Sequence, residues 1–124
     1  CLKNNIGILA YSPLQRGLLT GKMKPGQTFD ANDSRNGQIW YKDENILKIN
    51  AFLEKIKPLA DVKHATIGQL VISWTLEQPG LTIALVGARN VPQAIENAVA
   101  ADISLSKEEV TFISNELARL KLDY

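Results

Sequence analysis

The number and order of its strands limit the folds open to this 124-residue chain. Residues 6–11 and 82–87 are short apolar runs rich in β-forming residues, and each is followed by turn-forming residues. Continuous apolar runs of this length are typical of strands buried on both faces, as in parallel sheets. Helical patterns separate the two runs, so we expect a parallel pair joined by a right-handed crossover.

Capping signals and apolar spacing predict four helices. Asp43 is expected to cap the first, and Pro58 inside it predicts a kink or an early end. The signals that open the other three begin at Thr66, Asn90 and Ser106, and two of them are capping boxes. The predicted helices cover residues 44–62, 67–78, 92–100 and 107–120.

Two parallel strands make a poor sheet by themselves, because both edges remain open. The chain begins at Cys1 rather than at a methionine, and it enters its first apolar run almost at once. No linker or internal repeat divides it, so residues 1–124 are predicted to form a single domain. The incomplete sheet and the abrupt start lead us to expect a fragment or a proteolytic product.

Composition excludes several classes of partner. The net charge of +1 predicts no nucleic-acid or membrane binding, and no apolar run approaches the ~20 residues that span a bilayer. Cys1 is the only cysteine, so no internal disulfide forms and a cytoplasmic location is expected. The only histidine, His64, has no second ligand nearby; we expect it to complement a helix dipole and predict no metal site.

A long polar segment, residues 20–42, separates the first strand from the first helix and is rich in turn formers. Loops of this length are usually functional or mobile. Phe29, Trp40 and Tyr41 are either apolar contacts for a substrate or packing residues, and we favour packing.

The strand ends carry the residues best suited to a ligand. After the second strand, Gly87 leaves room for a phosphate at a helix N-terminus, and Arg89 adds donors suited to phosphate oxygens. Tyr11, at the end of the first strand, offers a flat stacking surface. Considered separately, the segment after the second strand is better explained as an ordinary strand-to-helix turn with capping residues. Tyr11 by itself is better explained as a core tyrosine. Taken together, they lie at the carboxyl ends of parallel strands, where ligands of α/β folds bind.

The same two segments resemble those of the aldo-keto reductases. Residues 11–22 (YSPLQRGLLTGK) resemble the seventh-strand segment of that family, and residues 87–97 (GARNVPQAIEN) resemble the segment after its eighth strand. Residues 67–78 resemble the family's Ala/Leu/Trp-rich helix. The resemblance implies an α/β fold that is the C-terminal portion of a (β/α)8 TIM barrel, with two parallel strands and about four helices.

The resemblance also implies an oxidoreductase that reduces a small carbonyl substrate with NADPH, and it assigns binding roles residue by residue. Tyr11 would stack on the nicotinamide ring, and Gly87 would pass close to the cofactor. The other implied contacts are Ser12, Leu14, Gly17 and Lys22 at the pyrophosphate and ribose, Arg35 near the pyrophosphate, Arg89 and Gln93 at the adenosine 2′-phosphate, and Glu96 and Asn97 at the adenine.

The family's catalytic Asp, Tyr, Lys and His lie on earlier strands and have no counterparts here, and Tyr11 does not match the catalytic tyrosine's motif. We therefore expect an NADP(H)-binding part of a reductase that is inactive alone. Two alternatives remain open: a non-catalytic nucleotide-binding module, and a structural fragment that self-associates through exposed strand edges. A chain that is the retained part of a longer protein is a further option.

Overall fold

The computed structural model describes residues 1–124 and contains two strands, four α-helices and four short 3-10 helices. In chain order these are η1 (Leu2–Asn4), β1 (Ile8–Tyr11), η2 (Gln15–Thr20), η3 (Ile39–Tyr41), α1 (Asp43–Val62), α2 (Ile67–Leu76), β2 (Leu81–Leu85), α3 (Val91–Val99), η4 (Ala100–Asp102) and α4 (Lys107–Arg119). β1 starts two residues later than expected, β2 starts one residue earlier and ends two earlier, α3 lies one residue earlier, and α2 ends two residues earlier.

The strands pair in parallel as a two-stranded sheet, as the sequence predicts. Tyr11 pairs with Leu85 and Leu9 with Ile83, so these four side chains share one face of the sheet. All four are exposed, between 44% for Leu85 and 78% for Tyr11. The expectation that both faces are buried is therefore wrong for this chain, because the side chains on this face remain open to solvent.

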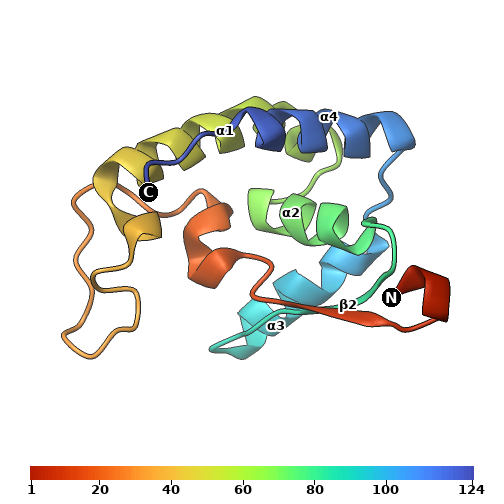
Figure 1. Ribbon diagram of the computed structural model, residues 1–124, viewed down its shortest axis with the longest axis horizontal. Helices are drawn as coiled ribbons and strands as arrows, with labels where there is room; N and C mark the ends of the chain where they lie inside the picture. Colours follow the sequence, from red (N-terminus) through yellow and green to blue (C-terminus); the bar gives the residue numbers. More distant parts are fainter.

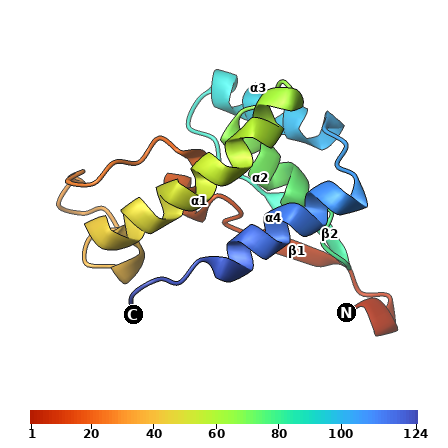
Figure 2. The same cartoon turned by 90° about the horizontal axis from the view of Figure 1, so that it is seen from above.

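Helices α1, α2 and α4 lie above the sheet. Figure 1 shows α1 and α4 along one side of the molecule, α2 below them, and the strands with α3 on the far side. Seen from above in Figure 2, α1 and α4 cross over α2. The core lies between these helices and η2, and no strand residue is buried. Its largest fully buried apolar side chains are Leu18, Ile46, Ile56, Leu70 and Ile113.

Local signals set most helix starts. Thr66 and Ser106 each form a complete capping box, and the Asn90 side chain accepts a hydrogen bond from the Gln93 N–H. Asp43 is not the N-cap of α1; Lys42 holds that position, and Asp43 Oδ1 accepts from the Gly26 N–H at 2.7 Å. The carboxylate is thus used to tie the preceding loop to the helix.

Pro58 does not end α1, which continues to Val62. A proline removes one backbone hydrogen bond and normally disfavours the helix. Here Ile56 and Ala60 flank it, are at most 1% exposed and belong to the core. Their packing holds the last turn, so the helix reaches Val62, the end expected from the sequence, and no early end is observed.

The long loop is held by packing. Phe29 and Tyr41 meet edge to face at 5.7 Å between ring centroids, and Trp40 meets Tyr124 in the same way at 5.6 Å. Tyr41 is buried, and Phe29 and Trp40 pack against the core. The packing interpretation of these three aromatic residues is therefore confirmed.

Candidate functional site

A cleft of about 680 Å³ opens at the carboxyl ends of β1 and β2. Because the strands are parallel, the segments that follow them emerge at the same edge of the sheet. All eleven residues that the sequence singled out for cofactor binding line this one cleft, although they span 87 positions of the chain. They are Tyr11, Ser12, Leu14, Gly17, Lys22, Arg35, Gly87, Arg89, Gln93, Glu96 and Asn97.

Tyr11 presents its ring to the cleft from the uncovered face of the sheet, with 78% of the residue exposed. The neighbouring Ser12 hydroxyl and Arg16 guanidinium lower the pKa of the Tyr11 phenol, because both favour the phenolate. No lysine, histidine or aspartate contributes to that shift. The exposed ring is available for stacking. The groups around its hydroxyl differ from the lysine and histidine that would adjust the pKa of a catalytic tyrosine.

The backbone folds sharply after Tyr11. Ser12, Gln15 and Arg16 all have positive φ angles, of 56°, 44° and 50°. Non-glycine residues rarely adopt this conformation, and such strain is concentrated at ligand sites. The Tyr41 hydroxyl donates to the Gln15 carbonyl at 3.1 Å, and Arg16 Nη1 donates to Ser34 Oγ at 2.7 Å. These bonds hold the long loop against the turn.

Arg35 lines the cleft, but its guanidinium is already paired. Its Nε and Nη2 donate to the two carboxylate oxygens of Asp33 at 2.9 and 2.6 Å, and the group lies 4.1 Å from the Phe29 ring centroid. The Arg35 guanidinium lowers the pKa of the Asp33 carboxyl to about 2. Arg35 thus carries less free charge toward a phosphate than the other cations of the cleft.

The segment after β2 leaves its backbone accessible. A Cβ built on Gly87 would meet nothing within 4 Å, so a ligand can approach the main chain there. Asn97 Nδ2 donates to the Gly87 carbonyl at 3.2 Å, and Gln93 Oε1 accepts from the Arg89 N–H at 2.9 Å. Two of the candidate side chains therefore also shape the turn that carries two other candidates, Gly87 and Arg89.

The donors of the cleft fit a dinucleotide. The Lys22 and Arg89 side chains are exposed and form no hydrogen bond or ion pair within the chain, so both charges are free for phosphate oxygens. Tyr11 offers an aromatic face, and Gly87 offers open backbone. An aromatic surface, two free cations and a helix N-terminus meet in one concave site.

The structure adds residues that sequence reasoning missed, among them Arg16, Thr66 and Gln69. Thr66 and Gln69 stood out as a capping box, but nothing local shows that the N-terminus of α2 faces α3. Arg16 lies inside the resembling segment, but its side-chain contact is with Ser34, eighteen residues away, which the local sequence does not reveal. Pairing of residues that are distant in sequence was the missing signal.

The only histidine and the only cysteine lie outside the cleft. His64 is exposed just beyond the end of α1, and Cys1 is an exposed free thiol. No group of three or more His, Cys, Asp or Glu side chains is arranged to hold a metal ion. None of the helices has both the length and the apolar character needed to cross a bilayer.

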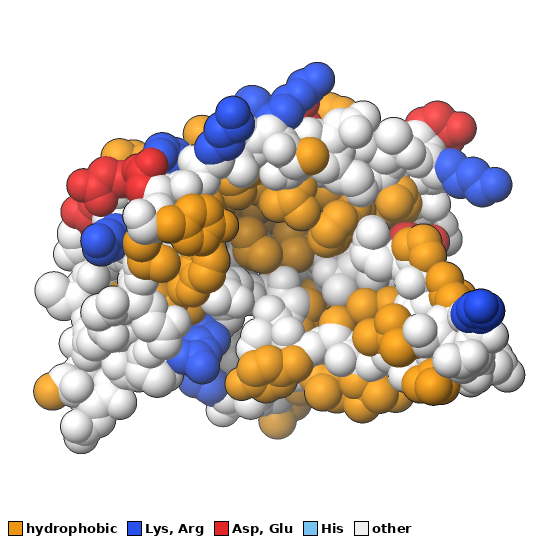
Figure 3. All heavy atoms as spheres, viewed as in Figure 1, with side chains coloured by type: hydrophobic (Ala, Val, Ile, Leu, Met, Phe, Trp, Pro, Cys, Tyr) orange, Lys and Arg blue, Asp and Glu red, His pale blue; other side chains and the backbone are white.

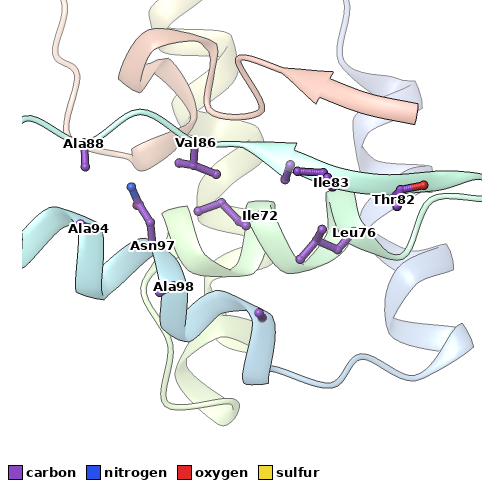
Figure 4. Close-up of a pocket in the computed structure, with 11 residues that line it drawn as sticks. Ile72, Leu76, Thr82, Ile83, Val86, Ala88, Ala94, Asn97 and Ala98 are labelled. Carbon is purple, nitrogen blue, oxygen red and sulfur yellow. The ribbon is translucent and has the colours of Figure 1, made fainter. Parts of the chain in front are cut away.

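A second hollow of about 430 Å³ lies between α2, β2 and α3 and is mostly apolar. Figure 4 shows Ile72 and Leu76 of α2 on one side of it, and Ala94, Asn97 and Ala98 of α3 on another. In the space-filling view of Figure 3, hydrophobic side chains gather between the upper helical layer and the strands. Apolar surface is therefore exposed around the sheet.

Parallel strands with a cleft at their carboxyl ends are the arrangement found in (β/α)8 barrels, of which this chain holds two strands. The model of the Aldo/keto reductase family matches residues 1–116. The chain belongs to the aldo/keto reductase family.

Individual relatives agree with this assignment. The chain is 35% identical to the NADH-specific methylglyoxal reductase of Escherichia coli over 91% of its own length, and 36% identical to the NADP(+) aldo-keto reductase yakc of Schizosaccharomyces pombe over 89%. It matches the structure of a glycerol dehydrogenase from Gluconobacter oxydans with a TM-score of 0.85 and 33% identity over 98% of the chain. It spans only 34%, 32% and 37% of the lengths of these three proteins.

Proposed function

We propose that this chain is the NADP(H)-binding part of an aldo-keto reductase that reduces aldehydes or ketones by hydride transfer, and that the chain alone is inactive. The observation that carries the proposal is the convergence of all eleven candidate residues on one cleft at the strand ends. Family membership makes a nicotinamide cofactor the expected occupant. As a member of a reductase family with a single cysteine, the protein is proposed to act in the cytoplasm.

In the proposed arrangement, Tyr11 stacks on the nicotinamide and Gly87 lets the cofactor approach the backbone. Ser12, Leu14, Gly17 and Lys22 border the pyrophosphate and ribose. Arg35 lies near the pyrophosphate, with its guanidinium also hydrogen-bonded to the Asp33 carboxylate. Arg89 and Gln93 bind the 2′-phosphate, and Glu96 and Asn97 contact the adenine.

NADPH is proposed over NADH because Arg89 is exposed and free of internal partners beside the N-terminus of α3. The relatives do not decide this point, since one is named NADH-specific and another carries NADP(+) in its name. The choice therefore depends on the residues of this chain.

The bound nicotinamide supplies the hydride, and this chain's residues bind and orient the ring and the phosphates. Reduction of a carbonyl also needs a proton donor at the oxygen. Tyr11 is the only tyrosine in the cleft, and the neighbours that lower its pKa are Ser12 and Arg16. We therefore assign Tyr11 no proton-transfer role. We propose that the groups that donate the proton belong to other parts of a complete enzyme.

Direct titration tests the proposal. Enhancement of NADPH fluorescence on addition of the 124-residue chain is the expected result, with no oxidation of NADPH when an aldehyde is added. Failure to bind NADPH contradicts the binding role. Oxidation of NADPH coupled to aldehyde loss contradicts the inactivity.

A second candidate function, self-association, is favoured by the uncovered sheet face and the free strand edges. Equilibrium sedimentation distinguishes it from the first. A chain that remains monomeric across a wide concentration range excludes it, whereas a concentration-dependent mass supports it.

A further inference from the structure

Core packing does not fix the position of helix α3. None of its residues is buried, although it carries three of the candidate contacts. On the side facing β2 it borders the apolar hollow of about 430 Å³, in which Ala94 and Ala98 stand opposite Ile72 and Val86 (Figure 4). Helices are normally placed by interlocking side chains. Few side chains of α3 interlock with its neighbours, so hydrogen bonds contribute more to holding the helix in position.

The N-terminus of α2 makes two side-chain hydrogen bonds to Glu96 of α3. Gln69 uses both ends of its side-chain amide, because Oε1 accepts from the Thr66 N–H and Nε2 donates to the Glu96 carbonyl, each at 2.9 Å. The Thr66 hydroxyl accepts from the Gln69 N–H at 3.2 Å and donates to Glu96 Oε1 at 3.3 Å. One capping box therefore holds both the backbone and the carboxylate of Glu96.

These bonds leave part of Glu96 free. Its carboxylate has two oxygens, and only Oε1 has a partner within the chain. Glu96 is half-buried and lines the cleft beside Thr66 and Gln69. A carboxylate held by one oxygen presents the other as a fixed acceptor, which suits a donor such as the exocyclic amine of adenine.

We infer that Thr66 and Gln69 are positioning residues that orient Glu96 to accept the adenine amine, so that the capping box of α2 sets the base selectivity of the cleft. This inference rests on the proposed function, since it assumes that a dinucleotide occupies the cleft. It adds two residues from a helix that neither strand-end segment includes.

Matched variants separate this role from helix capping. Aspartate caps helices about as well as threonine, so Thr66→Asp keeps the cap of α2 but removes the donor and faces Glu96 with a like charge. Thr66→Ser keeps both functions. Gln69→Glu retains the capping box but cannot donate to the Glu96 carbonyl. Far-UV circular dichroism and thermal melting of each variant check that the helices are intact.

The probes are NADPH and the corresponding hypoxanthine dinucleotide, which lacks the exocyclic amine, titrated by fluorescence against the 124-residue chain. The unmodified chain and Thr66→Ser are expected to prefer NADPH by about tenfold, the effect of one hydrogen bond to a charged acceptor. Thr66→Asp is expected to abolish that preference, and Gln69→Glu to reduce it. The hypoxanthine analogue should bind all four proteins with similar affinity.

The other outcomes overturn the inference in distinguishable ways. Equal weakening of both dinucleotides in Thr66→Asp and Gln69→Glu shows that the two residues only stabilise the fold. Binding of both probes by the unmodified chain without preference rejects the inference but leaves the proposed function standing. Binding of neither rejects both. Should Thr66→Asp fail to fold, an unchanged preference in Gln69→Glu rejects the inference by itself.

Discussion

Arg89 is the residue that decides between NADPH and NADH in our proposal. Replacing it by alanine removes a free guanidinium from the N-terminus of α3 and should weaken NADPH binding roughly ten- to a hundredfold, as expected for hydrogen bonds between charged groups. NADH lacks the 2′-phosphate, so its affinity should change little. Fluorescence titration with both cofactors measures the difference, and Arg89→Lys serves as the control that keeps the charge. Equal losses for NADPH and NADH would refute the role.

The pair of Asp33 and Arg35 makes a prediction about pH. Asp33 has its pKa lowered from 3.8 to about 2, first by the side-chain hydrogen bond from Arg35. Because the pKa of Asp33 is lowered in the folded state, its pairing with Arg35 stabilises the fold fully above about pH 4. This stabilisation is lost as the pH falls through 2. An NMR titration of the Asp33 carboxyl should show a midpoint near 2 that returns toward its ordinary value in Arg35→Met. A midpoint near 4 in the unmodified chain would contradict the pairing.

At the scale of elements, the side chain of Asn45 makes the hydrogen bonds that join the C-terminal tail to the start of α1. Asn45 is fully buried; its Nδ2 donates to the carbonyls of Ile39 and Asp123, and its Oδ1 accepts from the Asp123 N–H. Lys48 adds an exposed ion pair to Asp123, which contributes little. Asparagine is used here because it both donates and accepts.

Asn45→Ala should therefore lower the free energy of unfolding by about 2–3 kcal/mol, because buried carbonyl and N–H groups lose their partners. Urea denaturation followed by circular dichroism measures the loss. Asn115→Ala, at an exposed position of α4, is the control and should change stability by less than about 0.5 kcal/mol. Similar effects of the two substitutions would show that the tail is not held in this way.

For the whole molecule, the main physical feature is a sheet with one bare face. Leu9 and Ile83 are 56% and 46% exposed in adjacent strands, where a complete barrel would cover them. We expect the chain to bind a hydrophobic dye there. Replacing Leu9 and Ile83 together by glutamine should reduce dye fluorescence and leave the melting temperature nearly unchanged, since neither residue belongs to the core.

The control for this experiment is Leu47→Gln, because Leu47 is 58% exposed on α1 but stands apart from the sheet. It should leave dye binding almost unaltered. If both changes reduce the fluorescence equally, the dye reports general surface hydrophobicity rather than the bare face of the sheet.

The local parts of the fold could be predicted from the sequence by itself. Thr66, Asn90 and Ser106 start helices where the capping patterns predict, because a cap depends on residues three or four positions apart. The pairing of the two strands followed from their order and from the helices between them. The segments 11–22 and 87–97 could be identified for the same reason, since each is a continuous sequence motif that is recognisable without knowledge of its tertiary contacts.

Only the tertiary structure decided the contacts between distant residues. It placed Arg16 against Ser34, eighteen residues away, and brought Thr66 and Gln69 to Glu96. It also left Leu9 and Tyr11 bare, although their apolar run predicts burial. A strand can show that it is suited to burial, but burial depends on what packs against it, and that is set by the arrangement of the whole chain in space.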